Sequence, residues 1–167
     1  MALPTTLPDP VLPRLVGGPR VRWGVLAPGF IAGVFAGTLH ANTDQRIVAV
    51  ASRDRARGEA FAREHGIEHV AHDYRALVDD PGVDIVYIAA PHTQHLALAT
   101  LALEAGKHVL VEKPLAASAA EARELAAVAD RAGRFVMEAM HTRFHPRMTV
   151  VERLLADGAL GELRREL

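Results

Sequence analysis

The sequence predicts an α/β fold in which a doubly wound parallel sheet carries helices on both faces. Short apolar, strand-like segments recur along the chain, and helical patterns with brief connections alternate with them. Capping residues and glycines stand where several of these helical patterns begin or end. Because parallel strands need a long crossover, usually a helix, this alternation favours a parallel sheet over hairpins.

Six segments have the character of buried strands: 21–27, 46–52, 67–71, 83–90, 107–112 and 134–140. The fourth, VDIVYIAA, is the most strand-like because it is rich in β-branched residues. A further strand is expected at the end of the sequence, over 162–167 (ELRREL).

Helical patterns fill the intervals between these strands. A first helix follows the turn after 21–27 and ends near Leu39, and the later ones are 55–66, 74–80, 94–106, 119–133 and 147–158. Gly66 is a plausible C-cap and Asp73 a plausible N-cap. Ser118 with Glu121 forms a capping-box pattern.

Composition narrows the functional classes. The 167 residues suit one ordinary domain with a sizeable core, and half of them are hydrophobic. The net charge of −1 gives no nucleic-acid footprint, and the absence of cysteine excludes disulfides and thiolate chemistry. No apolar run approaches the roughly 18 residues that span a bilayer. Residues 1–20 hold five of the ten prolines and are expected to form a flexible arm, so we predict a soluble cytoplasmic protein.

The turn after the first strand resembles a dinucleotide fingerprint. APGFIA (27–32) matches G-x-G-x-x-G/A with Ala27 in place of the first glycine. Gly29 would let the backbone approach a pyrophosphate, and Ala32 is small enough for close packing of helix on strand. The helix that opens with Phe30 and Ile31 would offer its N-terminal amides to the phosphates. A purely structural turn is the competing interpretation.

The end of the second strand bears on the choice between NAD and NADP. An acidic residue that binds the ribose is usual there for NAD, whereas this chain has Ser52 followed by Arg53. A hydroxyl and a guanidinium suit a 2′-phosphate, and Arg57 could assist from the following helix. We therefore predict NADP. NAD stays possible, because Asp54 could take the acidic role and the arginines could simply be solvated.

Three more motifs follow predicted strands: APHTQH (90–95), EKP (112–114) and EAMHTRFHP (138–146). In open parallel sheets, ligands bind outside the carboxyl ends of the strands, which is where these motifs fall. Together with WGVLAPGFIA (23–32) and AGKHVLVEKP (105–114), they resemble the N-terminal NAD(P)-binding Rossmann domain of the Gfo/Idh/MocA oxidoreductases. The nearest branch holds trans-dihydrodiol dehydrogenases and NADP-dependent xylose dehydrogenases.

The resemblance implies a role for each motif. Lys113 would lie near the nicotinamide and the reacting hydroxyl as the catalytic residue, and Glu112 would lie near the nicotinamide ribose. Four more residues would belong to the cofactor site. Pro91 and His92 would line the cofactor groove, with His95 on the helix just below, and Arg143 would lie beside the nicotinamide or substrate end of the cleft. From the residues alone, a Glu-Lys pair at a strand end is more often an ordinary salt bridge.

Histidines raise the alternative of a metal site. The pair His92 and His95, and the pair His141 and His145, have spacings that could bind a metal, but no acidic partner has a recognisable ligand spacing with them. We predict no metal site. His141 stands where the resembled branch often has tryptophan, which leaves the shape of the substrate pocket open.

The resemblance also implies a second domain that covers the active site and usually forms a homodimer. The sequence ends near the start of that domain, so a fragment or a natural half is expected, with a strand edge exposed for association. The expected division is an arm (1–20), a dinucleotide-binding domain (21–145) and a last helix with the start of the second domain (146–167). The implied activity is NADP-dependent hydride transfer with a sugar, polyol or dihydrodiol. The alternative is a non-catalytic redox-sensing module.

Overall fold

The computed structural model describes residues 6–162, and the chain forms two compact units. The larger, which we call the sheet unit, is Leu15–Ala139. The smaller, the helix unit, combines Met1–Arg14 with Met140–Leu167. The divisions expected from the sequence, at residues 20 and 145, stay predictions.

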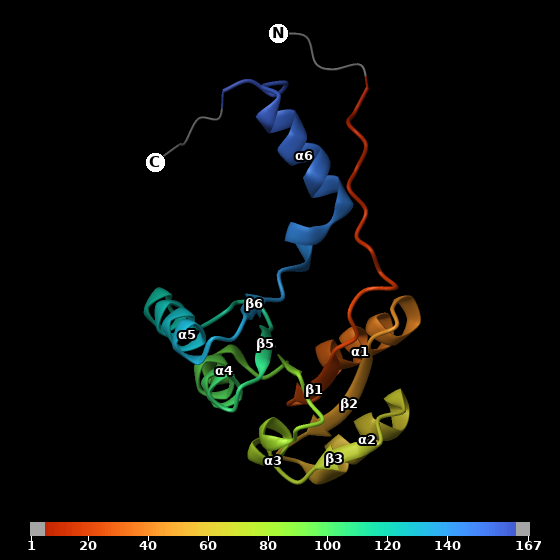
Figure 1. The fold of residues 1–167 in the computed structure, drawn as a ribbon, viewed down its shortest axis with the longest axis vertical. Coiled ribbons are helices and arrows are strands. Elements are labelled where there is room, and N and C mark those ends of the chain that lie inside the picture. Colours follow the sequence, from red (N-terminus) through yellow and green to blue (C-terminus); the bar gives the residue numbers. More distant parts are fainter. Residues whose placement is uncertain (1–5, 163–167) are drawn as a thin grey trace. The chain divides into compact units, whose positions relative to one another are not determined.

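The sheet unit is built on six strands, all parallel to their neighbours (Figure 1). In chain order they are β1 (Arg22–Leu26), β2 (Arg46–Ala51), β3 (His69–Ala71), β4 (Ile85–Ile88), β5 (His108–Val111) and β6 (Val136–Glu138). Their order across the sheet is β3-β2-β1-β4-β5-β6, so successive strands are added in one direction from β1 to β3 and in the opposite direction from β4 to β6. The predicted doubly wound parallel sheet is confirmed.

Helices cover the sheet on both faces, as the predicted fold requires. Those of the sheet unit are α1 (Phe30–Asn42), α2 (Arg55–His65), α3 (Tyr74–Asp79), α4 (His95–Glu104) and α5 (Ala119–Ala132). Helices α1 and α2 bury Ala36 and Phe61 in the same cluster as Tyr87 of β4. Helices α3, α4 and α5 bury Leu77, Leu103 and Leu125 in a separate cluster. The sheet therefore has two apolar cores.

Local sequence signals mark the helix ends correctly. The Asp73 carboxylate accepts a hydrogen bond from the Ala76 amide at 2.7 Å, and Ser118 Oγ accepts from the Glu121 amide at 3.2 Å. Glu121 in turn accepts from the Ala117 amide at 3.0 Å, one residue before the position usual in a capping box. Gly66 ends α2 in the left-handed conformation, with φ of 67°. The predicted caps are confirmed.

The elements differ from the predicted ranges mainly at their ends. Strand β4 stops at Ile88, two residues before the predicted end, and the chain then reaches Pro91, which cannot donate to a ladder. Helix α1 extends to Asn42 beyond the predicted Leu39. Two short 3₁₀ helices were not predicted: η1 (His92–Gln94) and η2 (His141–Phe144).

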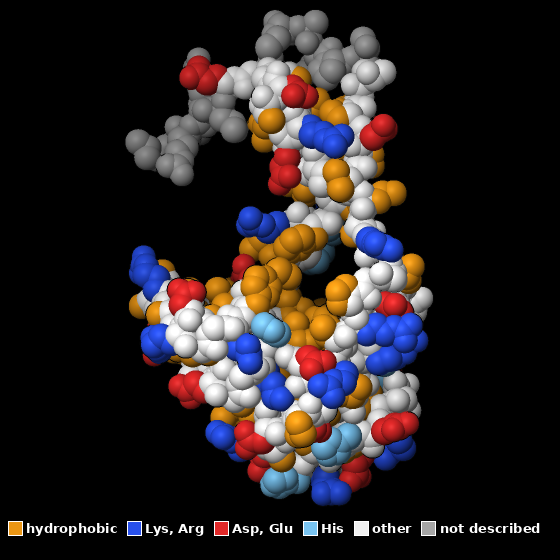
Figure 2. All heavy atoms as spheres, in the orientation of Figure 1, with side chains coloured by type: hydrophobic (Ala, Val, Ile, Leu, Met, Phe, Trp, Pro, Cys, Tyr) orange, Lys and Arg blue, Asp and Glu red, His pale blue; other side chains and the backbone are white. Residues whose placement is uncertain are grey.

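An ion pair ties the start of β1 to the segment before β4. Arg22 donates from Nη2 to Asp84 Oδ1 at 2.7 Å, and both its Nε and its backbone amide donate to Oδ2. These hydrogen bonds lower the pKa of Asp84 to about 2. Lys and Arg side chains are interspersed with Asp and Glu on the face of the sheet unit drawn in Figure 2. Within residues 6–162, no helix is long and apolar enough to cross a membrane.

The helix unit contains η2 and α6 (Pro146–Ala156). Two hydrogen bonds join the N-terminal arm to α6: Thr149 Oγ1 accepts from the Val11 amide at 2.8 Å, and Arg153 donates to the Asp9 carbonyl at 2.9 Å. These contacts secure part of the arm to the helix. The strand expected over 162–167 lies, except for its first residue, outside the described residues.

Candidate cofactor-binding site

The turn between β1 and α1 leaves its backbone accessible. Ala27 has φ of 59°, the left-handed region that glycine adopts more easily, and its amide donates to Ala51 O of β2 at 3.1 Å. This conformation explains why the fingerprint usually has glycine here. In this chain Ala27 adopts it with some backbone strain. Gly29 is the N-cap of α1, and a Cβ added there would meet no atom within 4 Å. The backbone at Gly29 thus faces open space.

The N-terminus of α1 also lacks a side-chain cap, unlike those of α2, α3 and α5. The latter three are capped by Asp54, Asp73 and Ser118. The first turn of α1 contains no acidic residue that would balance the helix dipole. Free amides and a positive dipole end are the features that bind a phosphate group, and here they open onto a cavity.

A cavity of about 480 Å³ lies at the carboxyl ends of β1, β2 and β4. Six of the residues predicted to bind the cofactor line it: Ala27, Gly29, Ser52, Arg53, Arg57 and Pro91. Three lining residues were not predicted: Pro28, Tyr74 and Ala89. A fourth, Asp54, was considered only as the acidic alternative that would favour NAD. Pro28 and Ala89 stand directly beside predicted strand ends, so their place could have been inferred. Tyr74 follows β3 and carried no comparable signal.

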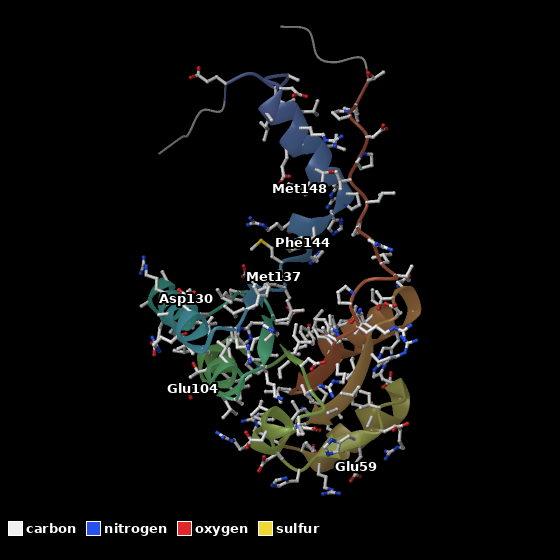
Figure 3. The ribbon with its side chains drawn as sticks, in the orientation of Figure 1. Glu59, Glu104, Asp130, Met137, Phe144 and Met148 are labelled. Carbon is white, nitrogen blue, oxygen red and sulfur yellow. The ribbon has the colours of Figure 1, made fainter. Side chains whose placement is uncertain are left out.

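The arginines around this cavity differ in their pairing. Arg55 donates to Glu59 at 2.8 Å, and both residues belong to α2, four positions apart (Glu59 is labelled in Figure 3). Arg53 and Arg57 form no side-chain hydrogen bond or ion pair with any residue in 6–162. Two guanidinium groups that have no side-chain partner among the described residues line the cavity, and such groups favour an anionic ligand.

The chain at the end of β2 is arranged by its own polar groups. Ser52 Oγ accepts from the Asp54 amide at 3.2 Å, and Asp54 Oδ1 accepts from the Arg57 amide at 3.1 Å. Asp54 therefore already caps α2 with one carboxylate oxygen. This use favours the arginines over Asp54 as the groups that meet the adenosine end of a dinucleotide.

The end of β5 places a carboxylate and an ammonium at the same rim of the sheet. Glu112 donates its amide to Ile88 O at 3.0 Å, which keeps it beside the end of β4. Its carboxylate accepts from Tyr87 Oη at 2.6 Å through Oε1 and from the Lys113 amide at 3.1 Å through Oε2. Lys113 itself is exposed and forms no side-chain salt bridge within 6–162, so the ordinary Glu-Lys pair is not present.

The other predicted residues take varied positions. Phe30 lines a neighbouring cavity of about 560 Å³ together with Gly29 and Arg57. Ala32 is fully buried against the sheet, as close helix packing requires. His92 is exposed in η1, and Ile31 is 41% exposed on α1.

His95 does not line the cavity, and Arg143 belongs to the other unit. His95 is 1% exposed, and its ring nitrogens lie 2.8 Å from Pro114 O and 2.9 Å from Ala90 O. The imidazole thus links the chain after β4 to the chain after β5 and has no free nitrogen for a ligand. Arg143 lies in η2 of the helix unit.

The histidine pairs do not form a metal centre in the described part of the chain. Residues 6–162 contain no group of three or more His, Asp or Glu side chains placed to hold a metal ion. His141 and His145 pack with ring centroids 5.3 Å apart, and His95 is engaged by backbone carbonyls.

These features fit a dinucleotide. An uncapped helix N-terminus suits a pyrophosphate, and open space at Gly29 admits its close approach. Two unpaired guanidinium groups suit a further phosphate at the end of β2. The cavity lies where strand order reverses between β1 and β4, the usual ligand position in such sheets.

Comparison with known proteins agrees with this geometry. Residues 21–140 match the family model GFO_IDH_MocA, described as "Oxidoreductase family, NAD-binding Rossmann fold". Trans-1,2-dihydrobenzene-1,2-diol dehydrogenase from Oryctolagus cuniculus is 48% identical over 142 residues, which cover 84% of this chain and 43% of the relative. The Homo sapiens enzyme of the same name is 42% identical and covers 86% of this chain and 44% of its own length.

Solved structures show the same fold. A 3-ketoreductase from Actinomadura kijaniata in complex with TDP-benzene and NADP superposes with a TM-score of 0.78 at 36% identity, covering 87% of this chain and 46% of that one. An NAD-binding oxidoreductase from Klebsiella pneumoniae gives 0.77 at 34% identity, covering 86% and 40%. The chain thus spans less than half the length of these proteins. On the match over 21–140 and the likeness of fold, the chain belongs to the Gfo/Idh/MocA oxidoreductase family and carries its NAD-binding Rossmann domain.

Proposed function

We propose that this chain is the NADP(H)-binding half of an oxidoreductase that transfers hydride between a nicotinamide and a secondary alcohol. The observation that carries the proposal is the cavity where an uncapped α1 N-terminus meets two unpaired arginines. The names of the relatives and the NADP in the ketoreductase complex support it. A dihydrodiol is the substrate that the names of the dehydrogenases favour, and a sugar or polyol is the wider class expected from the sequence.

The residues of the cavity would divide the binding of NADP(H) among them. The amides that begin α1 would donate to the pyrophosphate, which Gly29 lets approach closely. Arg53 and Arg57 would hold the 2′-phosphate, with the Ser52 hydroxyl beside them. Such an arrangement would orient the dinucleotide from β2 toward the ends of β4 and β5.

Lys113 would handle the proton of the reaction. The bound nicotinamide supplies or accepts the hydride. In alcohol oxidation, the substrate hydroxyl would donate a hydrogen bond to the neutral Lys113 amine, which would accept its proton as the C–H hydride leaves. In carbonyl reduction, the Lys113 ammonium would donate to the carbonyl oxygen and return that proton. The exposed side chain has no competing salt bridge within 6–162, so it is available to a substrate oxygen.

Replacing Arg53 with alanine is expected to weaken NADPH binding and to leave NADH binding nearly unchanged. A charge-assisted hydrogen bond to a phosphate contributes about 1.5–3 kcal/mol, which corresponds to roughly a 10–150-fold increase in Kd. Nicotinamide fluorescence titration of both reduced cofactors measures the two constants.

Arg55→Ala is the matched control, because Arg55 lies two residues away but pairs with Glu59 outside the cavity. It should bind NADPH like the unsubstituted chain. The assignment of the 2′-phosphate to Arg53 would be wrong if Arg53→Ala weakened NADPH and NADH binding equally, or if it weakened the binding of neither cofactor. Saturable binding of NADPH by the unsubstituted chain is required in every case.

A further inference from the structure

A buried tyrosine, Tyr87, holds the Glu112 carboxylate near the proposed nicotinamide end by a hydrogen bond. Tyr87 occupies β4, next to β5, and is 1% exposed. Its hydroxyl donates to Glu112 Oε1 at 2.6 Å. No sequence motif pointed to Tyr87, since it lies inside a strand, 25 positions before its partner.

The ring of Tyr87 is fixed by aromatic packing against α1. It stacks on Phe35 with ring centroids 4.1 Å apart, and Phe35 meets Trp23 edge-on at 5.3 Å. Burial, with the neighbouring carboxylate, raises the pKa of the Tyr87 hydroxyl, so the phenol stays protonated and acts as the donor. A rigid ring with one donor thus sets the position of Glu112 Oε1.

The other oxygen of the same carboxylate reaches the backbone of the catalytic candidate. Glu112 Oε2 accepts from the Lys113 amide at 3.1 Å. Since the two oxygens belong to one rigid group, the hydroxyl that positions Oε1 also positions the turn at Lys113. The carboxylate retains lone pairs for one more donor, such as a ribose hydroxyl.

We propose that Tyr87 is a positioning residue whose hydroxyl orients the Glu112 carboxylate toward the nicotinamide-ribose half of the cofactor. The inference rests on the proposed NADP(H) site and deepens it. It assigns Tyr87 no contact with the cofactor. Its influence should therefore be confined to ligands that carry the nicotinamide riboside, and should require Glu112.

The test compares two probes on the full chain: NADPH, and 2′,5′-ADP, which lacks the whole nicotinamide mononucleotide half and keeps the adenosine, its 2′-phosphate and one 5′-phosphate. Tyr87→Phe retains the ring and its stacking and removes only the donor. We expect the Kd of NADPH to rise about 3–10-fold, less than for a lost direct contact because Tyr87 acts only through Glu112, and that of 2′,5′-ADP to stay within about twofold. Calorimetry measures both, and retained binding of 2′,5′-ADP shows that the variant is folded.

A double-mutant cycle separates positioning from general structure. In a Glu112→Ala background, Tyr87→Phe should no longer change the Kd of NADPH, because the acceptor is gone. The proposal is overturned if Tyr87→Phe leaves NADPH binding unchanged, weakens both probes alike, or has its full effect without Glu112. Failure of the NADP(H) site itself looks different: the unsubstituted chain would bind neither probe, and the role of Tyr87 would fall with it.

Discussion

Replacing Lys113 with alanine is expected to lower turnover by about 10²–10⁴-fold, the usual contribution of a positioned acid–base group. Because the chain spans less than half of its relatives, turnover is best measured in a chimaera that continues with the remaining part of the rabbit relative, which is 48% identical. NADPH binding should be retained, since the groups that we propose to bind its phosphates lie at α1 and the end of β2. The loss should therefore fall on kcat.

Lys113→Arg is the matched control for charge. A guanidinium keeps the hydrogen bond to the substrate oxygen but does not release its proton, so activity should stay low. Turnover near that of the unsubstituted chimaera in Lys113→Ala would contradict the assigned role. NADPH binding by a chimaera that never turns over any sugar or diol would instead favour the redox-sensing alternative.

Leu77→Ala is expected to destabilise the sheet unit by about 3–4 kcal/mol, within the range for a fully buried leucine. Leu77 of α3 is 0% exposed, and its Cδ2 lies 2.7 Å from where a Cβ on Gly24 would stand. The side chain thus fills the space that glycine leaves on central strand β1. Urea unfolding, monitored by circular dichroism, measures the loss in the free energy of unfolding.

A second substitution tests that contact. Gly24→Ala alone should destabilise by about 1–3 kcal/mol through overpacking against Leu77 and Val83. Combined with Leu77→Ala, it should cost less than the sum, because the new methyl occupies part of the cavity. Leu15→Ala, at a leucine 52% exposed, should change the free energy of unfolding by less than about 0.5 kcal/mol. Strict additivity would refute the contact.

The parts of the fold that depend on neighbouring residues could be predicted from the sequence. Asp73 and Ser118 cap helices because the amides they bind are three positions away. The alternation of strands and helices predicts a parallel sheet because each helix is the crossover between two strands that are successive in the sequence. Strand order could not be derived in this way, since β1 lies between β2 and β4, and the latter begins 59 residues after the end of β1.

In the candidate site too, residues set by the local sequence could be predicted, whereas those set by distant contacts could not. Gly29, Ser52 and Arg53 could be predicted because each follows directly on a strand and carries a recognisable chemistry. Tyr74 and Tyr87 could not, because their roles depend on packing between distant segments. His95 was expected just below the cofactor groove, and the structure places both of its ring nitrogens within hydrogen-bond distance of backbone carbonyls, an arrangement that spacing does not reveal.

The central claim, that NADP(H) lies in this cavity with its nicotinamide beside Lys113, is tested most directly by amine labelling. Lys107 and Lys113 are the only lysines in the sequence. Lys107 is 9% exposed and donates to Asp80 O and Val83 O, so it serves as an unreactive internal reference. Acylation of Lys113, followed by mass spectrometry, should be slowed by saturating NADPH and not by 2′,5′-ADP. Equal rates of Lys113 labelling with and without NADPH would contradict the account.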